Sequence, residues 1–351
     1  MMKRELNRLR IGYAPISGKL DAPGDRRRFV HYARTRGIQF EMADPRRDYD
    51  LVILSQAADI TAWSRYRKGK IVYDLVDAYL AVPRTDPRAL FRGLGKYLSR
   101  QSRFLELDFR KSIEAMCRRA DAVLCSTVEQ QGDIANYCEN VRVILDMQSA
   151  TTTKVKREYK AASPPRLVWE GLPFTLAAFE QIAGALRRVQ RKTQFEMHIV
   201  TDLHYYRYLN RYAKTSTARL ANRLFDSAHL HAWNESSCAE IICASDLALI
   251  PLNLNDPFAR RKPENKLLLF WRLGMPTLTS ATPAYRRAMQ GAQLSMDCAT
   301  EGEWEVALEK YLTDESARRE AGQRGRAYAE QKYPEDKLLA AWDDVLESVL
   351  I

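Results

Sequence analysis

The stretch Lys262–Ser280, KPENKLLLFWRLGMPTLTS, decides the fold of this chain. It joins a charged turn to one short apolar helix and then to a strand. Gly274 lies where a left-handed C-cap would sit, and Pro276 just beyond it prevents the helix from continuing. Three polar residues begin the helix: Glu264, Asn265 and Lys266. The backbone N–H groups and positive dipole end of such a helix start suit a phosphate, although an ordinary αβ unit would show the same pattern.

Short apolar segments alternate with helical patterns in the first half of the chain. They are rich in β-branched residues, which is typical of parallel strands buried on both faces. These segments are Leu9–Pro15, Asp50–Gln56, Lys70–Asp77, Ala120–Thr127 and Val141–Asp146. Helical patterns between them include Asp25–Arg36 and a long Arg-rich run from Pro87 to Arg119. The alternation predicts βαβ units.

The polar, basic segment Gln148–Pro165 ends in two prolines and interrupts this alternation, as an interdomain linker would. A second alternating series follows it, made of Arg166–Gly171, Phe195–Asp202, His229–Asn234, Asp246–Asn253 and Pro276–Ala281. The tail from Glu301 has helical spacing. We therefore expect an α/β chain with a Rossmann-like domain at 1–150, a linker at 151–165, a second Rossmann-like domain at 166–333 and a final helix at 334–351.

The net charge of +11 is unevenly placed along the sequence. Residues 1–160 hold 31 Lys and Arg against 20 Asp and Glu, whereas the remainder holds 24 of each. A basic half predicts an anionic partner such as a membrane surface, a phosphate-bearing acceptor or nucleic acid, but solvated Arg-rich helices would give the same charge.

Several features favour a cytoplasmic location. No apolar run approaches the roughly 20 residues that span a bilayer, and the N-terminus lacks the apolar region of a secretory signal. The six cysteines show no CxxC spacing and indicate reduced thiols. We expect a cytoplasmic protein, with peripheral contact at the inner face of the membrane as the alternative.

The helix-and-glycine block at Lys262–Ser280 resembles the block that grips the sugar nucleotide in GT-B glycosyltransferases of the retaining group 1, or family 4-like, type. Three further segments are similar to blocks of that family in the same order: Ala120–Thr127, Ala244–Asn253 and Ala317–Tyr333. The resemblance implies two doubly wound domains facing a cleft, with the last helix crossing back to the first domain. The apolar residues that would anchor this helix are Trp342, Leu346 and Leu350.

The same resemblance implies an activity. It implies a metal-independent hexosyltransferase without a cofactor, which moves a sugar from a nucleotide-diphosphate donor to a hydroxyl acceptor. An anionic or lipid-linked acceptor, in cell-surface polysaccharide or glycolipid synthesis, would suit the basic first domain. A non-catalytic GT-B-like binding or scaffold protein is the alternative. A nucleic-acid-binding protein is a third interpretation, but no recognised module supports it and we expect no nucleic-acid partner.

The resemblance places donor binding in the second domain. Gly171, preceded by Glu170, matches the family glycine, but the basic residue that follows in the family is missing. A basic cluster could bind phosphate instead, and it consists of Arg260, Arg261, Lys262 and Lys266, with Glu264 and Asn265 beside it. The family's ribose-binding acidic residue is replaced by Leu269, so Glu264 is the candidate substitute.

Two carboxylates near the end of the third predicted strand, Asp74 and Asp77, are the catalytic candidates. The resemblance implies a group near the reacting sugar at this place. A carboxylate could take the proton of the acceptor hydroxyl or stabilise a cationic transition state, and Asp77 lies further past the strand. A helix N-cap at Asp77 and a buried, hydrogen-bonded Asp74 are the structural alternatives.

The loop after the first strand is the candidate acceptor site. Gly18 and Gly24 allow close backbone approach, and Asp25 could N-cap a helix whose first turn holds Arg26. The family's Gly-rich loop at this position contacts the acceptor. A flexible surface loop with a basic helix start would show the same residues.

Two patterns that suggest metal ligands are set aside. The Asp48–Asp50 motif, DYD, precedes a strand and therefore lies at the wrong end of the sheet for a D-x-D site. His229 and His231 would point to one face of a strand, but the spacing reveals no third ligand. We therefore predict no metal site.

Overall fold

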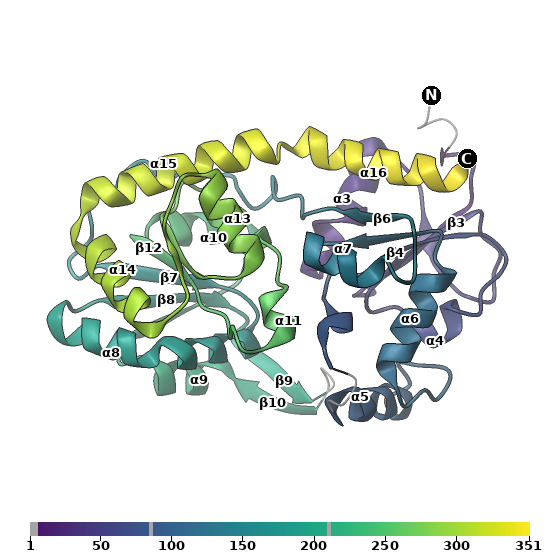
Figure 1. The fold of residues 1–351 in the computed structure, drawn as a ribbon, viewed down its shortest axis with the longest axis horizontal. Coiled ribbons are helices and arrows are strands. Elements are labelled where there is room, and N and C mark those ends of the chain that lie inside the picture. The colour runs from purple at the N-terminus through teal and green to yellow at the C-terminus, as the bar shows by residue number, and fades with distance from the viewer. Residues whose placement is uncertain (1–5, 84–86, 209–211) are drawn as a thin grey trace. The chain divides into compact units, whose positions relative to one another are not determined.

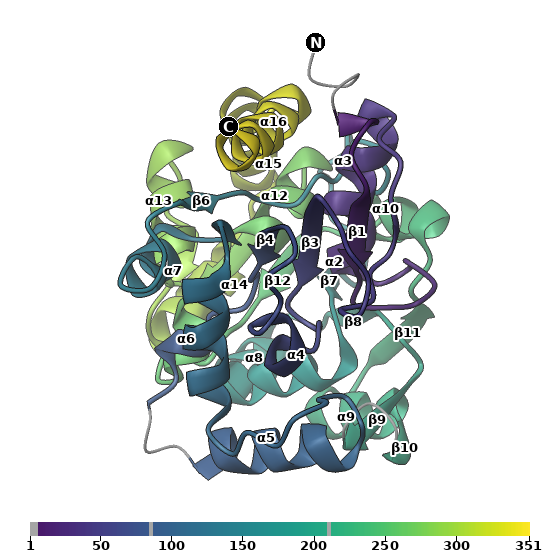
Figure 2. The same cartoon turned by 90° about the vertical axis from the view of Figure 1, so that its right-hand side faces the viewer.

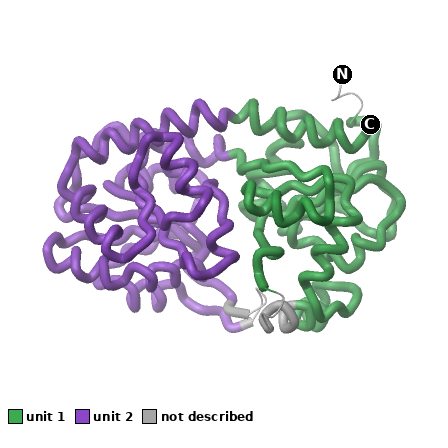
Figure 3. The backbone as a smooth tube through the Cα atoms, viewed as in Figure 1, with its two compact units in different colours: residues 1–147, 335–351 green, residues 148–334 purple. Residues whose placement is uncertain are grey.

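The chain forms two compact units in the computed structural model, which describes residues 6–83, 87–208 and 212–351 (Figure 3). Unit 1 consists of residues 1–147 and 335–351, and unit 2 of residues 148–334. The segment 151–165, predicted as a linker, therefore belongs to unit 2.

Unit 1 is built on a six-stranded parallel sheet with the order β2-β1-β3-β4-β5-β6 (Figure 1). The strands are β1 (Ile11–Ala14), β2 (Glu41–Met42), β3 (Leu51–Ser55), β4 (Lys70–Asp74), β5 (Ala122–Cys125) and β6 (Val141–Val143). Every residue of β3 and β5 is buried because helices cover both faces of the sheet. The strand order reverses between β1 and β3, so this is the topological switch point of the sheet.

The helices of unit 1 differ from the predicted ones in two places. They are α2 (Pro23–Arg26), α3 (Phe29–Arg36), α4 (Ile60–Trp63), η1 (Tyr79–Ala81), α5 (Pro87–Leu98), α6 (Phe109–Arg119), α7 (Val128–Ile134) and α16 (Glu335–Leu350). The predicted helix Asp25–Arg36 is helical over most of its length but is not continuous, because the backbone leaves helical geometry at Arg28, with φ −127° and ψ −116°. The predicted run Pro87–Arg119 is two helices, since Asp108 caps a new helix by accepting from the backbone N–H of Lys111.

The last helix, α16, packs on unit 1, as the resemblance implied. Trp342 is fully buried and stacks on Tyr32, with ring centroids 5.5 Å apart. The Asp343 carboxylate accepts a hydrogen bond of 2.9 Å from the Tyr32 hydroxyl. Leu346 is buried as predicted, but the prediction for Leu350 is wrong, because that side chain is 37% exposed.

Unit 2 contains a second six-stranded parallel sheet, in the order β11-β8-β7-β12-β13-β14. Its strands are β7 (Arg166–Glu170), β8 (Glu196–Thr201), β11 (Ala228–Ala232), β12 (Leu247–Ile250), β13 (Thr277–Ser280) and β14 (Asp297–Cys298). The switch point lies between β7 and β12. The helices are η2 (Pro173–Ile182), α8 (Ala183–Lys192), α9 (Thr217–Leu224), α10 (Glu235–Cys243), α11 (Pro257–Arg260), α12 (Asn265–Arg272), α13 (Pro283–Gly291), α14 (Glu301–Thr313) and α15 (Glu315–Lys332).

The sequence did not predict the edge strands β2 and β14 or a separate two-stranded sheet in unit 2. The two-residue strands β2 and β14 are too short to show a period. An antiparallel hairpin, β9 (His204–Tyr208) and β10 (Tyr212–Ser216), follows β8, and the residues that join its strands lie outside the described ones.

The segment 151–165 packs against the end of α12. Gly274 adopts φ +75°, which confirms the predicted left-handed residue after this helix. The backbone N–H of Lys156 donates to the Leu273 carbonyl, and the hydroxyl of the buried Tyr159 donates to the Gly274 carbonyl at 2.9 Å. The segment is therefore part of the structure that holds α12 in place.

The charge is shared more evenly between the units than between the halves of the sequence. Unit 1 holds 28 Lys and Arg against 24 Asp and Glu, and unit 2 holds 27 against 20. The basic segment 154–160 belongs to unit 2, and the acidic helix α16 belongs to unit 1. Unit 1 is therefore still basic, with a net charge of +4, but it does not hold all of the excess, because unit 2 carries +7.

Two further expectations concern membranes and thiols. No helix within the described parts of the chain combines the length and the apolar character that a membrane span requires.

All six cysteines are free thiols, four of them buried. Burial raises the pKa of Cys125 to about 12 and that of Cys243 to about 11, so both are protonated at neutral pH.

Candidate functional site

The sheet of unit 2 brings two predicted donor residues together at its switch point. Gly171 follows the carboxyl end of β7, and Lys266 lies in the first turn of α12. A side chain at Gly171 would place its Cβ 2.5 Å from Nζ of Lys266, so the ammonium group lies directly over this glycine. In open parallel sheets, ligands bind beyond the carboxyl ends of the strands at such a point.

Trp169 holds the Lys266 side chain in this position. Its ring is nearly fully buried in β7, and Nζ of Lys266 lies 4.8 Å from the ring centroid. A cation over an indole face is stabilised by the ring quadrupole. Nothing in the sequence indicated this contact, because it depends on how α12 crosses the strand.

Glu264 immediately precedes α12, but its side chain does not cap the helix. It is 7% exposed, and its Oε1 atom accepts a hydrogen bond of 3.0 Å from the Tyr333 hydroxyl. Burial, with the Glu264 carboxylate beside it, raises the pKa of Tyr333, so the phenol remains a donor. The carboxylate is therefore fixed in one orientation, and its role as the ribose-binding substitute stays a prediction.

Buried polar groups support the first and last turns of α12. The side chain of Gln148 donates to the Asn265 carbonyl at 2.6 Å and accepts from Arg272 at 2.6 Å. The same guanidinium group donates to the Tyr333 carbonyl. These contacts hold the helix start in place and were not predictable from sequence spacing.

The other predicted donor residues lie close by in the chain. Arg260 is exposed at the end of α11, Arg261 follows it, and Nζ of Lys262 lies 4.7 Å from the Phe258 ring centroid. Glu170 is 8% exposed at the end of β7. Their part in donor binding stays a prediction.

Leu269 is fully buried in α12. It occupies the position at which the GT-B family that this chain resembles has an acidic residue. Because its side chain belongs to the core of unit 2, the chain offers no carboxylate at this place.

An open pocket lies beside the helix that follows Gly171. Its volume is about 600 Å³. Aromatic, apolar and basic side chains from η2, the β9–β10 hairpin and α9 line it, including Phe174, Tyr205, Tyr206, Arg219 and Arg223. The sequence did not predict this pocket because it depends on the hairpin.

Asp74 in unit 1 belongs to a buried ion cluster. Both of its oxygens accept hydrogen bonds of 2.7 Å from Arg28, whose guanidinium group is fully buried. Another nitrogen of Arg28 donates to the Ile144 carbonyl at 2.8 Å and contacts Asp146 at 3.2 Å. The cluster joins the start of α3 to the ends of β4 and β6, which is the buried, hydrogen-bonded alternative considered for Asp74.

Asp77 lies three residues beyond β4 and is partly exposed. Gln56, which follows β3, exchanges two hydrogen bonds with it. The Gln56 amide donates to Oδ2 of Asp77 at 3.0 Å and accepts from the Asp77 backbone N–H at 2.8 Å. The carboxylate is thus oriented at the carboxyl end of the sheet, and its catalytic role stays a prediction.

The loop after β1 is shaped by Asp25. This carboxylate is fully buried and accepts from the Tyr13 hydroxyl at 2.6 Å and from the backbone N–H groups of Ile16 and Ser17 at 2.8 and 2.9 Å. The predicted N-cap role is wrong, because Asp25 lies within α2, whose N-cap is Ala22.

The remaining residues predicted to bind an acceptor differ in the space around them. A Cβ built on Gly18 would meet no atom within 4 Å, so a ligand can approach the backbone there. A Cβ on Gly24 would meet the Ile16 side chain at 2.5 Å, so this glycine serves packing. Arg26 ends α2 and is partly buried. Acceptor binding by this loop stays a prediction.

The structure places the DYD motif at the amino end of the sheet, as its position before a strand indicated. Oδ2 of Asp50 accepts a hydrogen bond of 2.7 Å from the backbone N–H of Arg10, and Asp48 pairs with Lys68. Both carboxylates therefore have structural partners.

Solved structures share this architecture. HepE from Anabaena, solved with UDP and glucose, is 12% identical with a TM-score of 0.66, and the match covers 97% of this chain and 100% of HepE. A sucrose-phosphate synthase from Thermosynechococcus elongatus is 12% identical with a TM-score of 0.60, over 91% of this chain and 75% of that one.

TarM from S. aureus, solved as a mutant with UDP, fondaparinux and α-GlcNAc-glycerol, is 10% identical with a TM-score of 0.58. The match covers 84% of this chain and 55% of TarM, so this chain spans about half the length of TarM. Neither a protein-family model nor a curated protein matches the sequence. At these identities the likeness establishes the fold, which is GT-B as predicted.

The Arg28 cluster generates a prediction about Asp74. We expect Asp74→Asn to lower the free energy of unfolding by about 3–5 kcal/mol, because it leaves a buried guanidinium charge without its main partner. Urea unfolding followed by circular dichroism measures this change. The control is Asp48→Asn, whose exposed carboxylate pairs with Lys68, and which should change stability by less than about 1 kcal/mol. Equal effects of the two variants would contradict the assignment.

Proposed function

We propose that this protein is a glycosyltransferase that moves a sugar from a nucleotide-diphosphate donor to a hydroxyl acceptor. The observation that carries the proposal is the position of Lys266 over Gly171, at the switch point of the sheet and at the start of α12. The GT-B fold supports it, since HepE of the same fold was solved with UDP-glucose. The base and the sugar of the donor are left open.

The proposed donor site stabilises the diphosphate as it leaves. When the bond between the sugar and the diphosphate oxygen breaks, negative charge grows on that oxygen. Lys266 and the positive end of α12 lie where they can stabilise this charge, with the neighbouring basic residues Arg260, Arg261 and Lys262 in support. We propose metal-independent transfer of a hexosyl group, with retention at the anomeric carbon by resemblance alone.

We propose that unit 1 binds the acceptor. The Asp77 carboxylate takes the proton of the acceptor hydroxyl as its oxygen bonds to the anomeric carbon, or stabilises the positive charge on the sugar. The accessible backbone at Gly18 and the side chain of Arg26, at the end of α2, are the proposed acceptor contacts. Asp25 acts indirectly, because its carboxylate holds the backbone of this loop.

A non-catalytic GT-B protein is the second candidate. The burial of Leu269 favours it, because no carboxylate stands at that place, and the nearby Glu264 is held by Tyr333. Such a protein would bind a nucleotide sugar without turning it over. Measured sugar transfer therefore separates the two candidates.

A patch of apolar and basic side chains in unit 1 supports a membrane-associated acceptor. Exposed apolar residues gather between the second half of α5 and the start of α6, namely Leu94, Tyr97, Leu98, Phe104, Leu105 and Leu107. The exposed Arg100 and Arg103 lie among them. Apolar side chains beside arginines suit the boundary of an anionic bilayer, and we propose peripheral contact with the inner face of the membrane in glycolipid or cell-surface polysaccharide synthesis.

The donor site predicts a nucleotide response that depends on Lys266. We expect one class of nucleotide diphosphate to raise the melting temperature of the wild-type protein, since a ligand at ten times its Kd stabilises the folded state by about 1.4 kcal/mol. Lys266→Ala should weaken binding about 10- to 100-fold because it removes a charged phosphate contact. A thermal-shift titration measures both effects.

The matched control is Lys332→Ala, which removes an exposed lysine at the end of α15. It should bind the nucleotide as the wild-type protein does. If no nucleotide shifts the melting temperature of the wild-type protein, the proposed donor site is wrong.

The assignment of Asp77 predicts a loss of turnover without a loss of stability. We expect Asp77→Asn to lower kcat by about 10²–10⁴-fold, because the amide cannot accept the acceptor proton. The melting temperature should stay near the wild-type value, since Asn keeps the shape of the side chain. Sugar transfer from the donor identified by thermal shift provides the assay. Glu139→Gln, at an exposed site of the same unit outside the apolar patch, should retain full activity.

The apolar patch predicts binding to anionic vesicles. We expect the wild-type protein to sediment with vesicles that contain phosphatidylglycerol, and less so with pure phosphatidylcholine or at high salt. Replacing Leu98, Phe104 and Leu105 by Ser should abolish this binding. The control is Val306→Ser, which removes a 70% exposed apolar side chain from unit 2. Unchanged sedimentation of the triple variant would refute membrane contact through this patch.

A further inference from the structure

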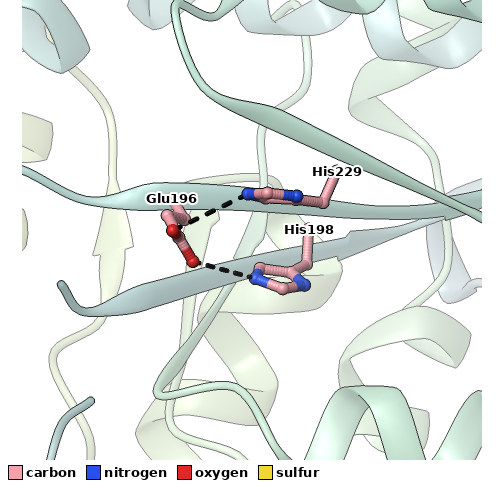
Figure 4. Close-up of side chains that lie close together, drawn as sticks. All are labelled: Glu196, His198 and His229. Carbon is pink, nitrogen blue, oxygen red and sulfur yellow. Dashed lines mark ion pairs between the residues drawn. The ribbon is translucent and has the colours of Figure 1, made fainter. Parts of the chain in front are cut away.

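The edge of the unit 2 sheet carries a cluster of histidines and one carboxylate. Figure 4 shows Glu196 and His198 on β8 and His229 on the edge strand β11. His231 lies two residues further along β11. Parallel pairing sets His229 beside His198, and residues two apart in a strand share a face. The four side chains therefore lie on one face of two neighbouring strands. The sequence showed only the HxH half of this arrangement.

Three of these side chains are arranged around a common point. Nε2 of His198 lies 3.6 Å from one Glu196 oxygen, and Nε2 of His229 lies 3.8 Å from the other. One potential ligand atom from each of the three residues falls within 4.8 Å of the others. Ligand atoms around a tetrahedral zinc ion with bonds of about 2.0–2.1 Å lie about 3.3 Å apart, so the three ligand atoms would approach one another by up to about 1.5 Å when a metal binds.

His231 sets the orientation of the His198 ring. Its Nε2 lies 3.0 Å from Nδ1 of His198, and the two rings are stacked within 9° of parallel. If Nδ1 carries the proton and donates it to His231, Nε2 of His198 presents its lone pair toward Glu196. Histidine ligands usually make such a hydrogen bond through the nitrogen that does not bind the metal.

The Nε2 atom of His198 is buried, and its 3.6 Å contact with Glu196 is longer than an ordinary hydrogen bond. A lone pair that faces a carboxylate is unfavourable unless a proton or a metal ion lies between them. A metal ion would satisfy this atom.

We propose that Glu196, His198 and His229 bind one divalent transition-metal ion of the zinc class. Imidazole nitrogens with a carboxylate favour zinc, cobalt, nickel or copper over magnesium and calcium, which prefer oxygen ligands. His229 is 47% exposed, so water can reach the fourth position. The ion clamps the edge strand β11 to β8 at the amino-terminal half of the strands, whereas the proposed donor site lies beyond their carboxyl ends.

Arg166 opposes this site electrostatically. It begins β7 and pairs in register with Glu196, so it lies beside the carboxylate on the same face of the sheet. Its charge repels a cation. The proposal therefore predicts effects of opposite sign for neighbouring residues, which a purely structural histidine cluster would not produce.

The test is metal binding by the full-length protein without a histidine tag. We expect titration calorimetry to give one Zn²⁺ per chain, Co²⁺ to give the visible absorption of a tetrahedral site, and Mg²⁺ to give neither signal. Zn²⁺ should also raise the melting temperature, and chelation should reverse the rise.

Variants then assign the ligands. His229→Ala and Glu196→Gln should abolish stoichiometric binding, His231→Ala should weaken it about 10- to 100-fold, and Arg166→Gln should strengthen it. His204→Ala, at an exposed histidine on β9 of the same unit, is the control. His229 is half-exposed, so its variant should fold, and circular dichroism checks this. Wild-type binding by His229→Ala, or no Zn²⁺ binding by the wild-type protein, would overturn the proposal.

Discussion

Helix α15 crosses α12 so closely that the crossing admits only glycine on α15. A Cβ at Gly322 would lie 2.3 Å from the Gly274 carbonyl oxygen, and one at Gly325 would lie 2.6 Å from the Trp271 ring. The left-handed backbone at Gly274 ends α12 at this point. The crossing fixes the direction of α12, and with it the place of Lys266 at the other end. It also sets the end of α15, where Tyr333 reaches Glu264. The geometry of the candidate donor site thus depends on a packing constraint at the far end of a helix.

Unit 1 depends on a different interaction, the buried guanidinium group of Arg28. It binds Asp74, Asp146 and the Ile144 carbonyl, and so joins one helix to two strands. A buried charge is tolerated only when its hydrogen bonds are satisfied, which explains why the helix breaks at this residue to direct the side chain inward. The same cluster occupies Asp74, so that Asp77 remains the better candidate for chemistry.

The fold was predictable because parallel strands buried on both faces leave a strong signal, as β3 and β12 show. Gly274 was predictable because few residues adopt its backbone conformation. Family resemblance named Lys266 and Gly171 as donor residues, but it predicted neither their contact nor the Trp169 contact, because nothing in the sequence states which side chain a helix will lie against. The prediction of an unbroken helix at Asp25–Arg36 failed for the same reason. Arg28 interrupts that helix because its side chain binds Asp74, which lies 46 residues further along the chain. Predictions from spacing succeed within an element and fail between elements.

The histidine cluster shows, within one sheet, that spacing predicts positions within a strand but not contacts between strands. Spacing alone relates His229 to His231, and Glu196 to His198, but each pair offers too few ligands for a metal site. Only the register between β8 and β11 sets His229 beside His198 and gives Glu196 a histidine neighbour on each strand. An edge strand has a backbone partner on one side alone, so a bridge between side chains adds a second connection there. The sheet of unit 2 would then carry a cationic phosphate site beyond the carboxyl ends of its central strands and a metal clamp near the amino end of its edge.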